Sequence, residues 1–128
     1  EEKKLKILLV KSRRSKRWVI PKGWKLATMN SRKSVAVEAW EEAGVQGKVS
    51  KRPVGFYHYR KSDKNASFFS CEVKVYSLNV LKLKKKFPEM SERKSKWFSC
   101  KDASTMVDEP ELKKIILKFQ KIITNERN

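Results

Sequence analysis

The chain has 128 residues, a length suited to one globular core, because most single domains contain roughly 100–200 residues. Its 32 lysines and arginines against 14 aspartates and glutamates give a formal net charge of +18, and a hydrophobic content of 39% excludes a disordered polyelectrolyte. Because the sequence has no run of about 18 apolar residues, we expect neither a membrane span nor an uncleaved secretion signal.

This excess of positive charge attracts polyanions, so the expected partner is a nucleic acid, a polyphosphate or another phosphorylated small molecule. The two cysteines, Cys71 and Cys100, are isolated in the sequence and form no Cys-x-x-Cys or Cys/His grouping. We therefore expect neither a disulfide framework nor a structural zinc site, and the reducing cytoplasm is the expected location.

The first third of the chain predicts two strands and a helix. Residues 5–10 and 17–21 are short apolar runs with β-branched members on either side of a basic turn, and a Pro-Lys-Gly sequence at 21–23 ends the second run. Residues 31–43 are rich in alanine and glutamate and are followed by Gly44, which is typical of a helix C-terminus.

The middle of the chain predicts a β-hairpin. Residues 49–60 and 67–81 are rich in aromatic and β-branched side chains and flank a polar turn, which favours a hairpin with one buried face. A polar loop is expected at 82–96.

The last third predicts a short strand at 96–100 and a helical turn at 102–106. Residues 109–123 place apolar side chains at steps of three and four residues opposite a lysine-rich face, which is the pattern of an amphipathic helix. The order of these elements predicts one α/β (α+β) domain over residues 1–128, with helices packed on a mixed sheet.

Three glutamates gather on the first predicted helix. At 100° per residue, Glu38, Glu41 and Glu42 fall within an arc of about 100°, which we expect at the surface of the helix. The opposite, apolar side is assigned to Ala36, Ala39, Trp40 and Ala43.

The setting of these three carboxylates is unusual for surface glutamates. None has a lysine or arginine three or four positions away, and all three lie in the C-terminal half of the helix, where the helix dipole disfavours negative charge. Oxygen ligands without histidine or cysteine favour a hard cation, Mg²⁺ or Mn²⁺. The alternative left open is a solvated acidic stripe.

Over residues 23–45 the chain resembles the Nudix box, whose pattern is G-x5-E-x7-R-E-U-x-E-E-x-G-U, with U an apolar residue. Every spacing of the frame is kept, and the matching residues are Gly23, Glu38, Glu41, Glu42, Gly44 and Val45. Met29 and Val37 stand where the pattern has its first glutamate and its arginine. We interpret this double change as an apolar replacement for an ion pair, which costs less than the loss of one partner alone.

The resemblance implies an α/β/α sandwich and the hydrolysis of a phosphoanhydride bond in a small polyphosphorylated substrate, with Mg²⁺ or Mn²⁺ as cofactor. The basic character of the chain resembles the Nudix group that acts on diphosphoinositol polyphosphates and diadenosine polyphosphates. Catalysis and metal binding are assigned to Glu38, Glu41 and Glu42, with Glu89 or Glu92 as a fourth acid. The residues expected around the substrate phosphates are Arg17, Lys22, Gly23, Lys25 and Arg60.

Two other functions are weighed against this one. An RNA 5′-end pyrophosphohydrolase would suit the positive charge. A catalytically inactive, nucleic-acid-binding Nudix fold would use a stacking strip made of Arg52, Phe56, Tyr57, Tyr59 and Arg60. A small-molecule substrate is preferred, because a pure polyanion binder gains nothing from three unpaired carboxylates. His58 is assigned no role, and the oligomeric state is left open.

Overall fold

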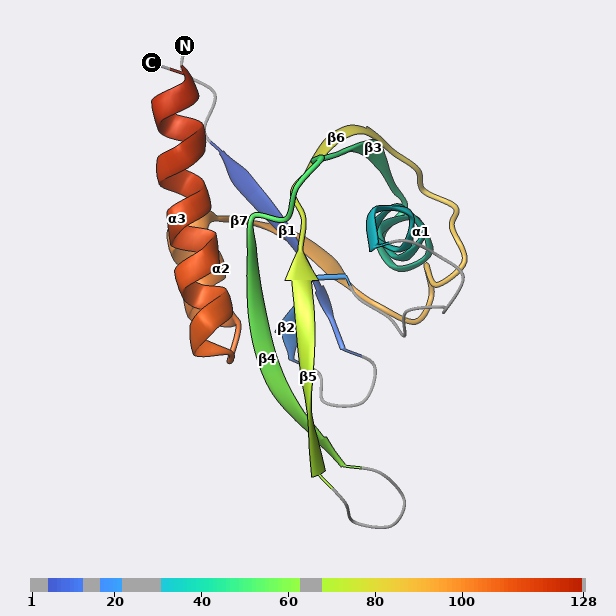
Figure 1. Ribbon diagram of the computed structural model, residues 1–128. Coiled ribbons are helices and arrows are strands. Elements are labelled where there is room, and N and C mark those ends of the chain that lie inside the picture. Colours follow the sequence, from blue (N-terminus) through green and yellow to red (C-terminus); the bar gives the residue numbers. More distant parts are fainter. Residues whose placement is uncertain (1–4, 13–16, 22–30, 63–67, 128) are drawn as a thin grey trace.

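The computed structural model describes residues 5–12, 17–21, 31–62 and 68–127, without the side chains of 31, 59–62, 68–71 and 126–127. The elements of this described part are shown in Figure 1. They are β1 (Lys6–Lys11), β2 (Trp18–Val19), α1 (Ser31–Ala43), β3 (Val45–Val49), β4 (Gly55–Ser62), β5 (Phe68–Val75), β6 (Leu78–Leu83), β7 (Ser95–Ser99), α2 (Cys100–Met106) and α3 (Pro110–Arg127).

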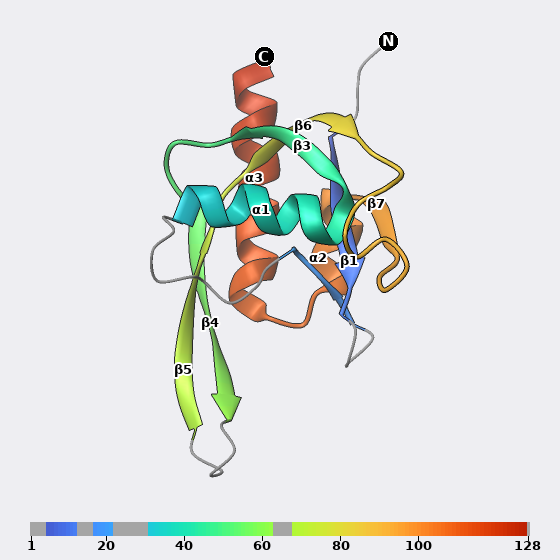
Figure 2. The ribbon, with the colours of Figure 1, turned by 90° about the vertical axis from the view of Figure 1, so that its right-hand side faces the viewer.

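The helices lie on two sides of the strands. α1 lies on one side, while α3, with α2 beside it, lies on the other, as the two perpendicular views show (Figures 1 and 2). This arrangement confirms the expected α+β fold. The longest helix begins at a proline, which suits the first helical position because the missing N–H would have no partner there. In the described part of the chain, no helix is long and apolar enough to cross a membrane.

Within the described ranges, the strands form three small sheets in place of the single mixed sheet that we expected. Their orders are β2-β1-β7, β3-β6 and β4-β5, and each of these described pairs is antiparallel. One reason for the difference is that the arm predicted at 67–81 contains two strands, β5 and β6, while the arm predicted at 49–60 contains β4 and only the last residue of β3.

Both breaks in the hairpin lie at the same level. The first arm is interrupted between Val49 and Gly55, where Pro53 has no N–H to donate to a strand partner. The second arm is interrupted after Val75. Backbone hydrogen bonds join the two breaks, from Ser50 to Ser77 at 2.8 Å and from Val54 to Val75 at 2.7 Å. The outer pair, β4-β5, therefore extends away from the body of the molecule, whereas β3-β6 stays beside α1 (Figure 2).

Two buried clusters hold the layers together, and β1 contributes to both. Leu9 and Val10 are each 0% exposed but belong to different clusters, because successive side chains of a strand point to opposite faces. The cluster beneath α2 and α3 contains Leu9, Tyr57, Val75, Phe98, Cys100, Ala103, Val107, Leu112 and Ile116. The cluster beneath α1 contains Val10, Val19, Ala39, Ala43 and Val45. The core therefore fixes the side of α1 that faces the strands.

Candidate active site

Glu42 lies on the buried side of α1. Its exposed fraction is 2%, comparable with 6% for Ala39 and 4% for Ala43, which pack against Val10 in the cluster beneath the helix. Ala36, which we had assigned to the apolar side, is exposed. The expectation that all three glutamates lie at the surface is therefore wrong for Glu42. The helix is rotated about its axis so that this carboxylate, and not Ala36, faces inward.

Burial changes the acid–base behaviour of Glu42. Its pKa is raised to about 8 from an ordinary value of 4.5, first because burial disfavours the charged form and then because it contacts the carboxyl group of Glu38. The positive charge of Arg93 acts in the opposite direction, and the negative charge of Glu89 adds to the increase. Glu42, Glu38 and Glu89 are therefore close enough to influence one another.

Arg93 is the cation that lies next to Glu42. Its Nη1 is 3.3 Å from Oε1 of Glu42, and its Nε donates a hydrogen bond of 2.8 Å to Oε1 of Glu89. The backbone N–H of Glu89 also donates to the carbonyl oxygen of Glu41 at 2.9 Å, which holds Glu89 beside α1. Arg93 was not predicted as a partner of Glu42, because helical spacing reveals only partners three or four residues away and this one comes from a distant loop.

The residues around Glu42 fit a divalent cation bound through few protein ligands. No group of three or more His, Cys, Asp or Glu side chains within the described ranges is placed to hold a metal by itself. However, Oε1 of Glu42 is buried without a hydrogen-bond partner among the described atoms, because its contact with Arg93 lacks hydrogen-bond alignment. Mg²⁺ is commonly held by one or two carboxylates together with substrate phosphates, so Glu42 with Glu38 provides a suitable donor set.

The other acids of the predicted site occupy different positions. Glu41 is partly exposed and accepts the Glu89 N–H through its backbone. Of the two candidates for a fourth acid, Glu89 lies beside Glu42, whereas Glu92 is exposed and donates its backbone N–H to the carbonyl of Glu89 at 3.0 Å. The geometry therefore favours Glu89.

The predicted phosphate-binding residues are only partly described. The Nη1 atom of Arg17 donates a hydrogen bond of 2.6 Å to Oδ2 of Asp108, which raises the pKa of the guanidinium and ties the start of β2 to the segment before α3. Lys22, Gly23, Lys25 and Met29 lie outside the described residues, as does the side chain of Arg60.

One interpretation from the sequence requires correction and another stays a prediction. Val37 is 37% exposed and Met29 lies outside the described residues, so the expected apolar brace between them stays a prediction. Tyr57 is 1% exposed and belongs to the core, whereas Phe56, its neighbour on β4, is 47% exposed. A continuous stacking strip that includes Tyr57 is therefore wrong, because alternate residues of a strand face opposite sides.

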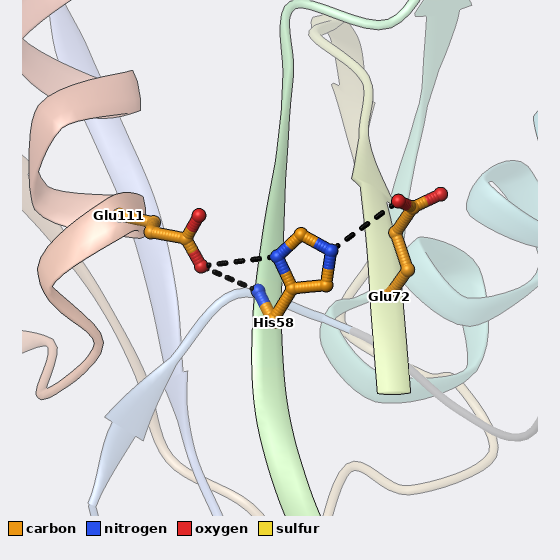
Figure 3. Close-up of polar contacts among 3 residues, drawn as sticks. All are labelled: His58, Glu72 and Glu111. Carbon is orange, nitrogen blue, oxygen red and sulfur yellow. Dashed lines mark hydrogen bonds and ion pairs between the residues drawn. The ribbon is translucent and has the colours of Figure 1, made fainter. Parts of the chain in front are cut away.

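His58, which has no role predicted from the sequence, lies between two carboxylates (Figure 3). Its backbone N–H donates to Oε1 of Glu111 at 2.8 Å, its Nδ1 is 3.3 Å from the same oxygen, and its Nε2 is 3.3 Å from Oε2 of Glu72. The backbone hydrogen bond is the main reason that the pKa of Glu111 is lowered. Because the ring nitrogens face different carboxylates, this group fastens the β4-β5 hairpin to the first turn of α3 and does not form a shared metal site.

The fold and the site combine in one arrangement that can be compared with known proteins. A helix with an E-x-x-E-E sequence packs against one side of the antiparallel strands, and its last glutamate is buried near a second carboxylate from a loop. Comparison with protein-family models finds no match.

Two curated proteins are similar to the chain in sequence. The chain is 25% identical to "Nudix hydrolase 12, mitochondrial" of Arabidopsis thaliana over 97% of its own length, and 24% identical to "Nudix hydrolase 13, mitochondrial" of the same plant over 98%. It spans 63% and 64% of the lengths of these two relatives. By sequence, the chain is therefore similar to members of the Nudix hydrolase family.

The solved structures show the same fold. A binary complex of the C. elegans Ap4A hydrolase superposes with a TM-score of 0.66 at 19% identity, covering 95% of this chain and 88% of that one. A second structure of the C. elegans Ap4A hydrolase gives a TM-score of 0.64 at 20% identity, with coverages of 94% and 87%. At this level of identity the comparison concerns the fold alone.

Proposed function

We propose that this chain is a metal-dependent hydrolase that cleaves a phosphoanhydride bond in a small polyphosphorylated substrate. The observation that carries the proposal is the carboxylate of Glu42, which is 2% exposed and has one oxygen without a hydrogen-bond partner among the described atoms. A buried, unsatisfied carboxylate oxygen is costly to a folded protein unless a ligand completes its contacts. A divalent cation, Mg²⁺ or Mn²⁺, is the ligand that suits it.

Each acid has a proposed task at this site. Glu42 and Glu38 bind the cation, and Glu41 shares in ligation. When bound, the cation neutralises charge on the phosphate oxygens and lowers the pKa of a water molecule. Glu38 or Glu89 accepts the proton of the water whose oxygen attacks phosphorus. Because Glu42 is held on a helix and surrounded by core residues, its carboxylate is oriented before the substrate binds.

The substrate class proposed is a dinucleoside polyphosphate or a diphosphoinositol polyphosphate. The formal net charge of +18 favours a ligand with many phosphate groups over an ordinary nucleotide sugar. The name of the C. elegans protein, Ap4A hydrolase, supports the dinucleoside type. Lys22, Gly23, Lys25 and Arg60 are proposed to surround the phosphates, together with Arg17 if it can leave Asp108.

The experiment is a hydrolysis screen with a matched inactive variant. Diadenosine polyphosphates, a diphosphoinositol polyphosphate, a nucleotide sugar and 5′-triphosphorylated RNA are each incubated with Mg²⁺, Mn²⁺ or EDTA, and the products are separated and quantified. We expect metal-dependent cleavage of the first two classes and its loss in Glu42→Gln. Preferential cleavage of the RNA would support the pyrophosphohydrolase alternative, and no cleavage of any compound would contradict the proposal.

A further inference from the structure

We propose that Arg93 is a positioning residue, which holds the carboxylate of Glu89 beside Glu42 and thereby forms the fourth-acid position of the site. This inference rests on the proposed function, because it concerns how the same cation is bound. It assigns a role to a residue outside the Nudix box.

The contacts of Arg93 place one guanidinium between two carboxylates. Its Nε is 2.8 Å from Oε1 of Glu89 and its Nη1 is 3.3 Å from Oε1 of Glu42. The three side chains are 12%, 18% and 2% exposed for Arg93, Glu89 and Glu42. Ion pairs at the surface contribute little, but this one is largely shielded from water, where a planar guanidinium with fixed donor directions sets geometry effectively.

The backbone and the side chain of Glu89 are fixed by different contacts. The hydrogen bond from its N–H to the carbonyl of Glu41 holds the backbone against α1 at 2.9 Å. The loop that carries it starts with a second hydrogen bond to the end of α1, from Lys84 N–H to Gly44 O, also at 2.9 Å. Neither bond determines where the carboxylate points. That direction is set by Arg93, which offsets the repulsion that Glu89 would otherwise experience from Glu42.

The cation beside Glu42 does not come from the arginine position of the box. Val37 occupies that position and is 37% exposed, so no cation on that part of α1 accompanies the glutamates. The cation that contacts Glu42 instead comes from the loop, on the same segment as the acid that it orients. Arg93 therefore ties the loop acid to the helix acid.

The experiment measures Mn²⁺ binding by electron paramagnetic resonance on the full chain, without substrate. We expect Arg93→Ala and Glu89→Gln each to weaken Mn²⁺ binding by about tenfold or more, and Arg93→Lys to recover part of the loss. If Arg93 acts through Glu89, the double variant should bind Mn²⁺ within about twofold of Glu89→Gln alone. Arg32→Ala is the matched control, because Arg32 lies on α1 but donates to the carbonyls of Ser50 and Val49.

The outcomes separate this inference from the proposed function. If the unaltered chain binds no Mn²⁺ in the absence of substrate, this inference fails, whereas the proposed function is decided by the hydrolysis screen. If the unaltered chain binds Mn²⁺, then unchanged or tighter binding in Arg93→Ala, or additive losses in the double variant, overturn the positioning role alone. If Arg93→Ala does not fold, Mn²⁺ binding is compared between Arg93→Lys and Arg93→Lys combined with Glu89→Gln. Lysine keeps the positive charge of Arg93 but lacks the planar guanidinium with its fixed N–H donors.

Discussion

Gly44 lies directly against the ring of Phe87: a Cβ atom at this glycine would be 2.4 Å from Cδ1 of Phe87 and 2.6 Å from the carbonyl oxygen of Lys84. Its φ of 68° is also in the left-handed region, where L side chains are strained. The closing glycine of the box thus ends α1 and lets the loop that carries Glu89 approach the helix. Gly44 therefore contributes both to the end of the helix and to the position of the loop acid.

Gly44→Ala should destabilise the protein by at least about 2 kcal/mol, because it adds backbone strain and a clash with a backbone oxygen that cannot move aside cheaply. Thermal and urea unfolding measure the loss. Gln46→Ala, at an exposed position of β3, is the control and should change stability little. Phe87→Ala in the Gly44→Ala background should restore only part of the loss. Full stability of Gly44→Ala would show that the loop is not held as described.

Glu42→Gln should reduce metal-dependent turnover by far more than tenfold, because it removes the charge that the cation requires while keeping the size of the side chain. Steady-state kinetics with Mg²⁺ and Mn²⁺ measure the effect. A decrease of tenfold or less corresponds to a barrier change of about 1.4 kcal/mol or less and would contradict the proposed role of Glu42.

The stability of the metal-free protein should depend on pH through the same residue. The pKa of Glu42 is raised to about 8 in the folded chain from an ordinary value of 4.5. The folded state therefore binds this proton more tightly than the unfolded state, so the stability present below about pH 4.5 is lost as the pH rises toward 8. In EDTA, the unaltered chain should lose stability across this range relative to Glu42→Gln, and parallel curves would contradict the burial argument.

The sequence predicted the parts of the fold that depend on local patterns. The helix at 31–43 was confirmed at both ends, because an alanine- and glutamate-rich segment followed by glycine leaves few alternatives. The depth of Glu42 could not be derived in the same way, because helical spacing gives the angles between side chains but not which angle faces the core. The pairing with Arg93 depends on a loop whose path no periodicity describes. The division of the hairpin was missed because Pro53 was read as part of a continuous strand.

Val37→Arg restores the arginine of the Nudix pattern and tests whether Val37 takes part in a buried apolar brace. Because Val37 is 37% exposed, the new guanidinium can remain in water, and stability should change by no more than about 0.5 kcal/mol. Chemical denaturation provides the measurement. A loss of several kcal/mol, reduced when Met29→Glu is added, would instead support the buried apolar brace expected from the sequence.

The last prediction concerns the phosphate-binding role of Arg17, which donates to Asp108 at 2.6 Å in a pair whose side chains are 47% and 60% exposed. An exposed pair of this kind contributes only about 0–1 kcal/mol, so substrate phosphates can compete for the guanidinium. Arg17→Ala should raise KM more for a diadenosine polyphosphate than for a nucleotide sugar, and this difference should shrink at high salt. Lys22→Ala should act in the same direction.

Asp108→Ala is the matched control for Arg17→Ala, because it breaks the same structural contact but leaves the cation available. It should leave KM for the diadenosine polyphosphate unchanged or lower it, since Arg17 no longer has to leave Asp108 before it contacts phosphate. If both variants raise KM equally for every substrate, Arg17 serves only to fasten β2 to the segment before α3. The proposed preference for substrates rich in phosphate would then depend on Lys22 and the other basic residues. If Lys22→Ala also raised KM equally for both substrates, this preference would be contradicted.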